Sequence, residues 1–206
     1  MPKKVKNIPT NYMVTTLAKI VIPILIIILI GLSFALPEAE PSITGTYSGV
    51  SSTSYSNTSF FGMTTGSSFN SWSNYSSAAA KYMSSSEAAA VSGGVGMIYA
   101  SLAFAILALL IALACLVFNF VDTPGPLKGK ELVFPVIGAI FLILTIGLYY
   151  AGVSAVLNAF VSGFSGTIKY TTGFSLSYGA YLIILALVLN IVYVILSLTS
   201  WKKTPA

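Results

Sequence analysis

The chain alternates long apolar segments with polar connections, and this pattern predicts a bundle of membrane-spanning helices. A helix needs about 20 mostly apolar residues to cross the hydrocarbon core of a bilayer. We expect four such spans, at 13–36, 93–121, 132–160 and 178–201. The polar segments around and between them are 1–12, 37–92, 122–131, 161–177 and 202–206. The predicted fold class is therefore an all-α integral membrane protein, an antiparallel bundle of four transmembrane helices with a long Ser/Thr-rich loop.

The polar segment at 37–92 differs from an ordinary linker because it is aromatic and almost uncharged. Between Pro37 and Val91 it holds sixteen serines, six threonines and only four charged residues. Residues 43–61 alternate weakly between small polar and larger side chains, and 167–171 are strand-like, so a small sheet could cover the outer ends of the helices. Residues 77–90 favour a helix that runs toward the second span until Gly93 and Gly94 loosen it.

The lysines predict the orientation, because cytoplasmic segments of membrane proteins carry an excess of positive charge. All ten basic residues are lysines, and only Lys81 and Lys169 fall in the two longer polar loops. The other eight are Lys3, Lys4, Lys6, Lys19, Lys128, Lys130, Lys202 and Lys203. We therefore expect a multi-pass protein of the cell (plasma) membrane with both termini and the 122–131 turn in the cytoplasm. The two glycosylation sequons, at Asn57 and Asn74, then lie in the extracellular loop.

Small residues recur along three of the predicted helices at spacings that place them on one face. Such residues allow close backbone approach, which holds helices together in lipid. They are Ser101, Ala105, Ala108 and Ala112 in the second span, Gly138, Thr145, Gly152 and Ala159 in the third, and Gly179 and Ala186 in the fourth. We expect these stripes to face one another, with Leu- and Ile-rich faces and positions such as Leu142 toward lipid. Contact with a second copy of the chain is the alternative use of a small-residue stripe.

Candidate chemistry is sparse. The chain has no histidine, one cysteine, 7% charged residues and a mean hydropathy of +0.89. Metal centres, nucleophilic sites and intramembrane proton relays depend on the side chains that are missing here. Glu38, Glu40 and Glu87 are expected at the membrane edges of the loop, without a paired-carboxylate arrangement. We predict no catalytic residue, no metal site, no cofactor and no nucleic-acid partner, since the net charge of +5 comes from lysines that flank apolar segments.

Three asparagines fall inside the predicted spans: Asn119, Asn158 and Asn190. A transmembrane asparagine either donates a hydrogen bond to a neighbouring helix or lines a path for an ion or solute. We expect interhelical hydrogen bonds, and a polar lining is the alternative.

In its layout the chain resembles the claudin-type tetraspan membrane proteins: four spans, both ends inside, a long first outer loop and a short second one. The likeness extends over the whole chain and implies the four-helix architecture. The chain lacks that family's Trp-Gly-Leu-Trp motif and paired loop cysteines, and Trp72 stands alone in the loop. We therefore do not infer from this resemblance that the chain forms cell junctions or lines a pore.

These features favour a non-enzymatic membrane protein that acts as a structural or accessory subunit of a larger cell-surface or envelope assembly. Its expected partners are the lipid bilayer and other membrane protein subunits or copies of itself. Two alternatives stay open: a small oligomeric channel or transporter subunit with Asn190 or Asn158 on its path, and a virion membrane protein. The scarcity of exterior charge suits a prokaryotic envelope, including that of an acid-adapted archaeon.

Overall fold

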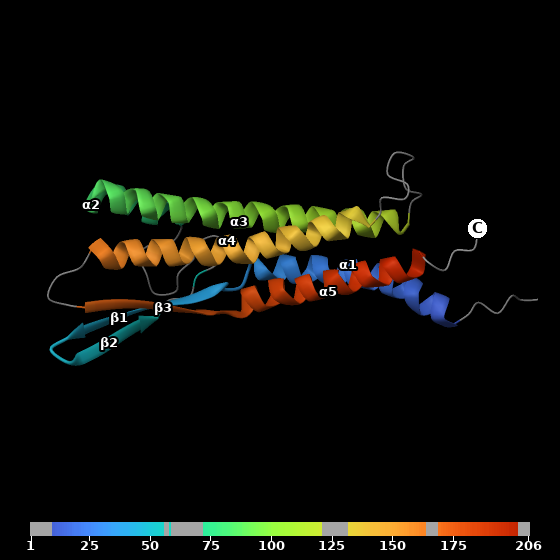
Figure 1. The fold of residues 1–206 in the computed structure, drawn as a ribbon, viewed down its shortest axis with the longest axis horizontal. Helices are drawn as coiled ribbons and strands as arrows, with labels where there is room; N and C mark the ends of the chain where they lie inside the picture. The colour runs from blue at the N-terminus through green and yellow to red at the C-terminus, as the bar shows by residue number, and fades with distance from the viewer. Residues whose placement is uncertain (1–9, 56–57, 59–71, 121–131, 164–168, 202–206) are drawn as a thin grey trace, which may run out of the picture.

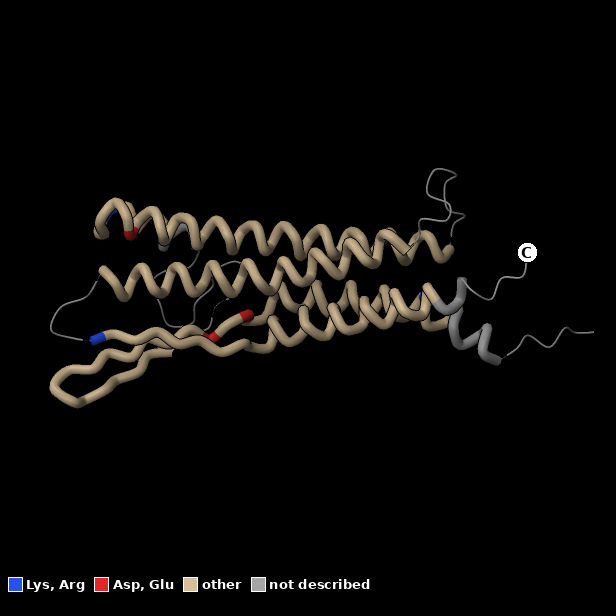
Figure 2. The backbone as a smooth tube through the Cα atoms, in the orientation of Figure 1, with Lys and Arg blue, Asp and Glu red and all other residues tan. Residues whose placement is uncertain are grey.

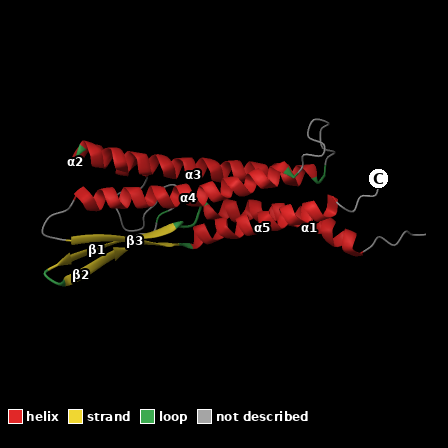
Figure 3. Ribbon diagram, viewed as in Figure 1, coloured by secondary structure: helices red, strands yellow, loops and turns green. Residues whose placement is uncertain are grey.

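The computed structural model describes residues 10–55, 58, 72–120, 132–163 and 169–201, which form long helices and one small sheet (Figures 1 and 3). The elements, in chain order, are α1 (Thr10–Ser33), β1 (Ala39–Tyr47), β2 (Val50–Tyr55), α2 (Trp72–Tyr82), α3 (Ser85–Phe118), α4 (Val133–Gly163), β3 (Lys169–Leu176) and α5 (Tyr178–Trp201). The protein is therefore mostly helical, and the sheet expected from the two outer loops is present.

Three helices, α3, α4 and α5, are long and apolar enough to cross a membrane, which indicates a multi-pass membrane protein. α3 has 34 residues and α4 has 31, so at about 1.5 Å per residue both are longer than the roughly 30 Å hydrocarbon core. The apolar part of α1, Leu17–Ser33, is shorter than these three segments.

The elements form two layers along the length of the molecule (Figure 1). α3 and α4 run side by side over the full length of one layer. α1 and α5 form the other layer over part of that length, and the sheet continues it beyond their outer ends. This arrangement follows from the connections, because β1 comes directly after α1 and β3 directly precedes α5.

The sheet has the order β2-β1-β3, and both pairings are antiparallel. β1 and β2 are joined by a two-residue turn in which Ser48 and Gly49 both have positive φ, 47° and 82°. Two such residues in succession are typical of the tight hairpin turn whose twist matches the flanking strands. On β3, half-buried and exposed residues alternate, and the half-buried Phe174 packs on Tyr150 of α4 with ring centroids 4.0 Å apart. The sheet therefore turns one face to α4 and the other to solvent.

α2 and α3 are separate helices, which corrects the expectation of one helix that weakens at Gly93 and Gly94. α3 begins with a capping box: Glu87 N–H donates to the side chain of Ser84, and Ser84 N–H donates to the Glu87 carboxylate. From there α3 continues without a break through both glycines. The local cap therefore decides where the helix starts, and tertiary contacts outweigh the weak helix propensity of glycine.

Gly94 lies where α3 and α4 approach most closely. A Cβ atom at Gly94 would be 2.8 Å from the Gly152 carbonyl oxygen, and one at Gly152 would be 2.6 Å from the Gly94 carbonyl oxygen. Only glycine fits on both sides of such a contact. Nearer the other end of the bundle, the Ser101 hydroxyl donates to the Thr145 carbonyl at 2.8 Å. Close backbone approach and a buried hydrogen bond therefore join these two helices.

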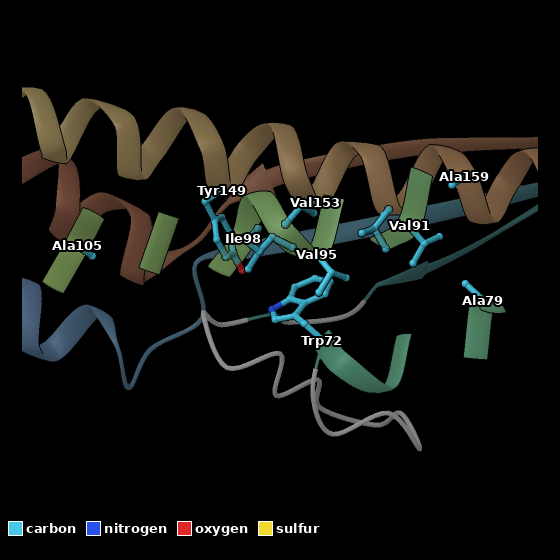
Figure 4. Packing of buried hydrophobic residues seen from close by; sticks show 11 residues of the cluster. Trp72, Ala79, Val91, Val95, Ile98, Ala105, Tyr149, Val153 and Ala159 are labelled. Carbon is cyan, nitrogen blue, oxygen red and sulfur yellow. The ribbon is translucent and has the colours of Figure 1, made fainter. Parts of the chain in front are cut away.

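The buried hydrophobic residues of the core form two clusters. In the outer one, Trp72, Val95, Ile98, Tyr149 and Val153 lie close together, with Trp72 directed toward α3 (Figure 4). This cluster joins α2 to the α3–α4 pair. Ala105 and Ala159 belong to the same cluster.

The inner cluster shows that α1 contributes large side chains to the core. Ile22, Ile26 and Ile30 are buried together with small residues of α3 and α5, among them Ala108, Ala112 and Ala186. The second-span stripe is therefore shared between two clusters, and an isoleucine face of α1 points inward instead of toward lipid. Leu142, expected on the lipid side, is 1% exposed and belongs to this core. The expectation failed because Leu142 lies four residues after Gly138 and three before Thr145, which places it on the same face of α4 as the small-residue stripe.

Candidate functional site

The junction between the sheet and the helix ends buries a carboxyl group, that of Glu38. The backbone of Glu38 is fixed on both sides: its N–H donates to the Thr58 carbonyl at 2.7 Å, and its carbonyl accepts from Ser177 N–H at 3.0 Å. Gly179 N–H, in the first turn of α5, donates to the carbonyl of Pro37 at 2.8 Å. These bonds tie the α1–β1 turn to the start of α5 and bring the Glu38 side chain inside.

The Glu38 side chain is 2% exposed, and its Oε1 atom has no hydrogen-bond partner among the described residues. The carboxyl group packs against Gly179, where a Cβ atom would be 2.7 Å from both Cδ and Oε1 of Glu38. A cavity of about 10 Å³ beside it is lined by Tyr149, Ala180 and Ile183. That volume is close to the minimum that one water molecule requires.

Burial raises the pKa of Glu38 from 4.5 to about 8. Loss of water solvation disfavours the charged form, and no neighbouring cation in the described structure compensates for it. The carboxyl group is therefore mostly neutral at pH 7. A neutral acid can donate one hydrogen bond or release one proton at alkaline pH, but catalysis of proton transfer also needs a positioned partner.

A short chain of hydroxyl groups lies next to this carboxyl. Thr58 and Tyr149 share a hydrogen bond between their hydroxyl groups at 3.2 Å, and the Thr58 hydroxyl also donates to the Ala39 carbonyl at 3.3 Å. These bonds join the first loop to the middle of α4. The polar groups at the junction thus fix the sheet on the bundle.

The three asparagines lie at different positions along the bundle, and each forms a hydrogen bond with another helix or with the sheet. Asn190 is 6% exposed and donates to the Pro135 carbonyl at 2.8 Å, so it links α5 to α4. Asn119 donates to the carbonyls of Lys19 and Cys115 at 2.8 and 2.9 Å. It also donates to the Tyr193 hydroxyl at 3.2 Å, which places it between α3, α1 and α5.

Asn158 lies on the outer part of α4 and is exposed. Its side-chain oxygen accepts a hydrogen bond from the Thr172 hydroxyl of β3 at 2.9 Å. It therefore joins α4 to the sheet, away from Asn190 and Asn119.

The remaining small residues of the predicted stripes are buried at helix contacts. Thr145 is fully buried, and its hydroxyl donates to the Phe141 carbonyl of the preceding turn at 2.8 Å. A Cβ atom at Gly138 would be 3.1 Å from Ile111 of α3 and 3.2 Å from the Asn190 amide. Of the two sequons, Asn57 lies outside the described residues, and Asn74 is exposed on α2. Glycosylation at both stays a prediction.

The outer edge of the sheet is formed by β2, whose six residues are all exposed. Tyr47, Val50 and Tyr55 are 58%, 74% and 72% exposed. In the described part of the chain, β2 pairs with β1 alone, so its other edge has no partner strand among the described residues. On the solvent face of the hairpin, hydroxyl pairs join the strands, with Thr44–Thr53 at 2.8 Å and Thr46–Ser51 at 2.9 Å.

Charge is scarce over this whole outer part. Figure 2 shows acidic residues near the start of β1 and of α3, and lysines at the start of β3 and in α2, with long uncharged stretches between them. The described residues include no group of three His, Cys, Asp or Glu side chains that could hold a metal ion. The sheet and the neighbouring helix ends therefore expose mainly hydroxyl groups and aromatic rings, with few charged side chains.

Glu38 was expected at a membrane edge, and its burial was not predicted. One signal was available, since Glu38 follows the last apolar residues of the first span directly, in a chain with five acidic residues. Gly179, which packs against the Glu38 carboxyl group, is distant in sequence, so the local sequence pattern could not predict this contact. No protein-family model and no curated protein matches this chain at a significant level, so the geometry of the junction and the strand edge carries the functional proposal.

Proposed function

We propose that the protein is a non-enzymatic structural subunit of a cell-surface assembly, and that copies of the chain associate through the open edge of β2. The observation that carries this proposal is an exposed, uncharged edge strand on the solvent side of a rigidly attached sheet. Unpaired backbone groups on such an edge form a template for another strand. Natural proteins usually block an open edge with lysine, proline or a bulge, and β2 has no such residue.

A second copy is the partner that fits this edge best. Two β2 strands can pair antiparallel about a twofold axis, which makes the same surface complementary to itself. Val50 and Tyr55 of β2 would then lose exposed apolar area, and the residues between them are serine and threonine, which pair well across strands. The sparse charge gives little repulsion between copies.

The proposed topology has four spans, with α1 as the first. α1 has 24 residues, about 36 Å, and it contributes three isoleucines to the core shared with α3 and α5. The lysine distribution supports an outside position for the sheet, because the segments at the sheet end carry only Lys81 and Lys169, whereas the other eight lysines fall in sequence at the opposite ends of the proposed spans.

A structural role is favoured over conduction by the asparagines. Asn190 and Asn119 donate to nearby backbone carbonyls, and Asn190 is buried. A conducting path needs a continuous series of polar groups open to water. Proteoliposomes that contain the purified protein should therefore show no ion flux above empty vesicles, and a flux that disappears in Asn190→Leu would support the channel alternative instead.

Association is tested by a charge placed on the edge. Val50→Lys should shift the purified protein from oligomer to monomer in light scattering, because a lysine on each copy opposes strand pairing. Thr171→Lys, which adds the same charge to exposed β3, is the matched control and should leave the oligomer intact. A wild-type monomer, or equal effects of the two lysines, would contradict the proposal.

A further inference from the structure

A cavity of about 890 Å³ lies between the sheet, α2 and the end of α4 nearest the sheet. Its walls include Ile43 of β1, Ala78 of α2 and Leu157 of α4, so it belongs to three elements distant in sequence. Cavities that bind small molecules commonly have volumes of about 300–1,000 Å³. This one is large enough for a ligand, and Ser54 is the β2 residue in its lining.

The cavity is apolar at its base and open at its rim. Trp72, Val153 and Val156 in its wall are 3%, 1% and 2% exposed, whereas Tyr82 at the rim is 76% exposed. Figure 4 shows Trp72 and Val153 in the cluster at this base, between α2 and the two long helices. An apolar surface of this size that stays in contact with water favours any apolar molecule that displaces the water.

The shape of the cavity follows the axis of α4. Its α4 wall runs from Val153 to Gly163, about 15 Å at 1.5 Å per residue. Hydroxyl groups lie at both ends: Thr58 near the bundle, and Ser84 beside Glu87 at the start of α3. The site thus presents an elongated apolar channel with hydrogen-bonding groups at its ends, which matches a single hydrocarbon chain with a polar head.

The position of the cavity identifies the source of such a chain. About 20 residues of α4 counted from Val133 reach Gly152, so the cavity begins where α4 leaves the hydrocarbon core of a membrane. We propose that this cavity binds one acyl or isoprenoid chain of an amphiphile, drawn up from the adjacent leaflet or captured as a free fatty acid. This inference does not depend on strand-edge association, because the cavity is lined mainly by residues outside β2, and its β2 residue, Ser54, is not substituted in either test.

Trp72 provides a direct readout, because it lies in the cavity wall and the chain has only two tryptophans. In a Trp201→Phe background, its fluorescence is recorded in nanodiscs while a fatty acid brominated at mid-chain is added. Bromine quenches tryptophan on close contact, and mid-chain bromines dissolved in the bilayer lie well below the cavity. We expect saturable quenching that an unbrominated fatty acid reverses.

A second arm replaces the free fatty acid by nanodisc lipid brominated at mid-chain. Quenching in this arm assigns the chain to membrane lipid, and quenching by the fatty acid alone assigns it to a free amphiphile. Either result supports the site.

Two variants fill the cavity from opposite walls: Ala78→Phe from α2 and Leu157→Phe from α4. Each should weaken binding of the brominated chain by about tenfold or more. Ile143→Phe, at a lipid-facing position of α4 that is 57% exposed, is the matched control and should bind as the parent does. Because Ala78 lies on α2 and Leu157 on α4, the test still holds if one of the two variants does not fold.

The proposal is overturned if quenching is absent, rises without saturation, or is equal in the cavity variants and Ile143→Phe. Strand-edge association is measured separately by light scattering, so failure of one proposal does not resemble failure of the other.

Discussion

The two helix pairs of the bundle are held together by different kinds of contact. α3 and α4 meet backbone to backbone at Gly94 and Gly152, and any side chain there would collide with a carbonyl oxygen. α1 and α5 instead pack through larger side chains such as Ile26 and Ile183, and Gly31 of α1 faces open space. Close backbone approach between two helices therefore distinguishes the α3–α4 pair, which extends past α1 and α5 alongside the sheet.

The difference has a physical reason. Lipid offers no hydrophobic drive for helix association, so two long helices gain most from contacts that bring their backbones close. α1 and α5 are also tied by the sheet, because β1 and β3 pair along their length just beyond the two helices. The hydrogen bonds between β1 and β3 therefore hold α1 next to α5, as the glycine contacts hold α3 next to α4.

The largest expected effect is at the glycine contact itself. Gly152→Leu should lower the free energy of unfolding by about 3 kcal/mol or more, because the new side chain has no space beside the Gly94 carbonyl and Ile98. Gly147→Leu, on the same helix but with no atom within 4 Å of its Cβ position, is the control. Thermal unfolding in mild detergent measures both. Equal melting temperatures would show that the α3–α4 crossing is not glycine-dependent.

The next effect concerns Glu38, whose carboxyl is the close neighbour of Gly179 at the outer end of the α1–α5 pair. Its pKa is about 8 when folded and 4.5 in its ordinary state, so between these values the folded protein holds a proton that the unfolded chain releases. Stability should therefore fall as pH rises through this window, by about 2–3 kcal/mol between about pH 5.5 and about pH 7.5. Melting curves at several pH values test this.

In Glu38→Gln the pH dependence over that window should largely disappear, because the amide cannot titrate. Glu40→Gln removes an exposed carboxyl two residues away and should leave the dependence in place. A wild-type protein that becomes more stable from pH 5.5 to 7.5 would mean that Glu38 is charged in the folded state.

A smaller effect is expected where the two helix pairs meet. Asn190→Leu removes the donor to the Pro135 carbonyl and should reduce the free energy of unfolding by about 1 kcal/mol. Asn158→Leu, at an exposed position, should cost less. If chemical unfolding gives Asn158→Leu the greater loss, the Asn190 bond is not what joins α4 to α5.

The smallest effect should occur in α1. Gly31→Leu places a side chain where no atom lies within 4 Å, so the melting temperature should change little. A loss as large as that of Gly152→Leu would show that α1 also depends on close backbone approach, and the contrast between the pairs would be wrong.

Hydrophobic pattern predicted the parts of this fold that depend on local sequence. Three long apolar helices and a small sheet joining the two outer loops were predicted, because apolar length and strand propensity are properties of neighbouring residues. The separate α2 was not predicted, although the Ser84–Glu87 capping box is visible as Ser-x-x-Glu. The helix propensity of the alanine-rich residues on both sides of the cap favours one continuous helix, whereas the capping box marks the start of a new one.

The junction could not be predicted in the same way. Burial of Glu38 depends on the space that glycine leaves at position 179 and on the hydrogen bond from Glu38 N–H to the Thr58 carbonyl, which are contacts between distant parts of the chain. The buried face of α1 was also not predicted, because isoleucine occurs on several sides of that helix and does not mark one face by its spacing. Such contacts are set by the assembled fold.

The central claim is that copies of the chain meet through β2 on the outside of the cell, and cysteine cross-linking on intact cells tests it most directly. In a Cys115→Ala background, Ser52→Cys places a thiol at the middle of β2, and a membrane-impermeant bifunctional reagent should join two copies into a covalent dimer. Thr171→Cys on β3 should react without forming dimers, and Gly129→Cys, in the predicted cytoplasmic turn, should not react. Reaction at Gly129 alone, or no dimer from Ser52→Cys in cells that label there, would contradict the account.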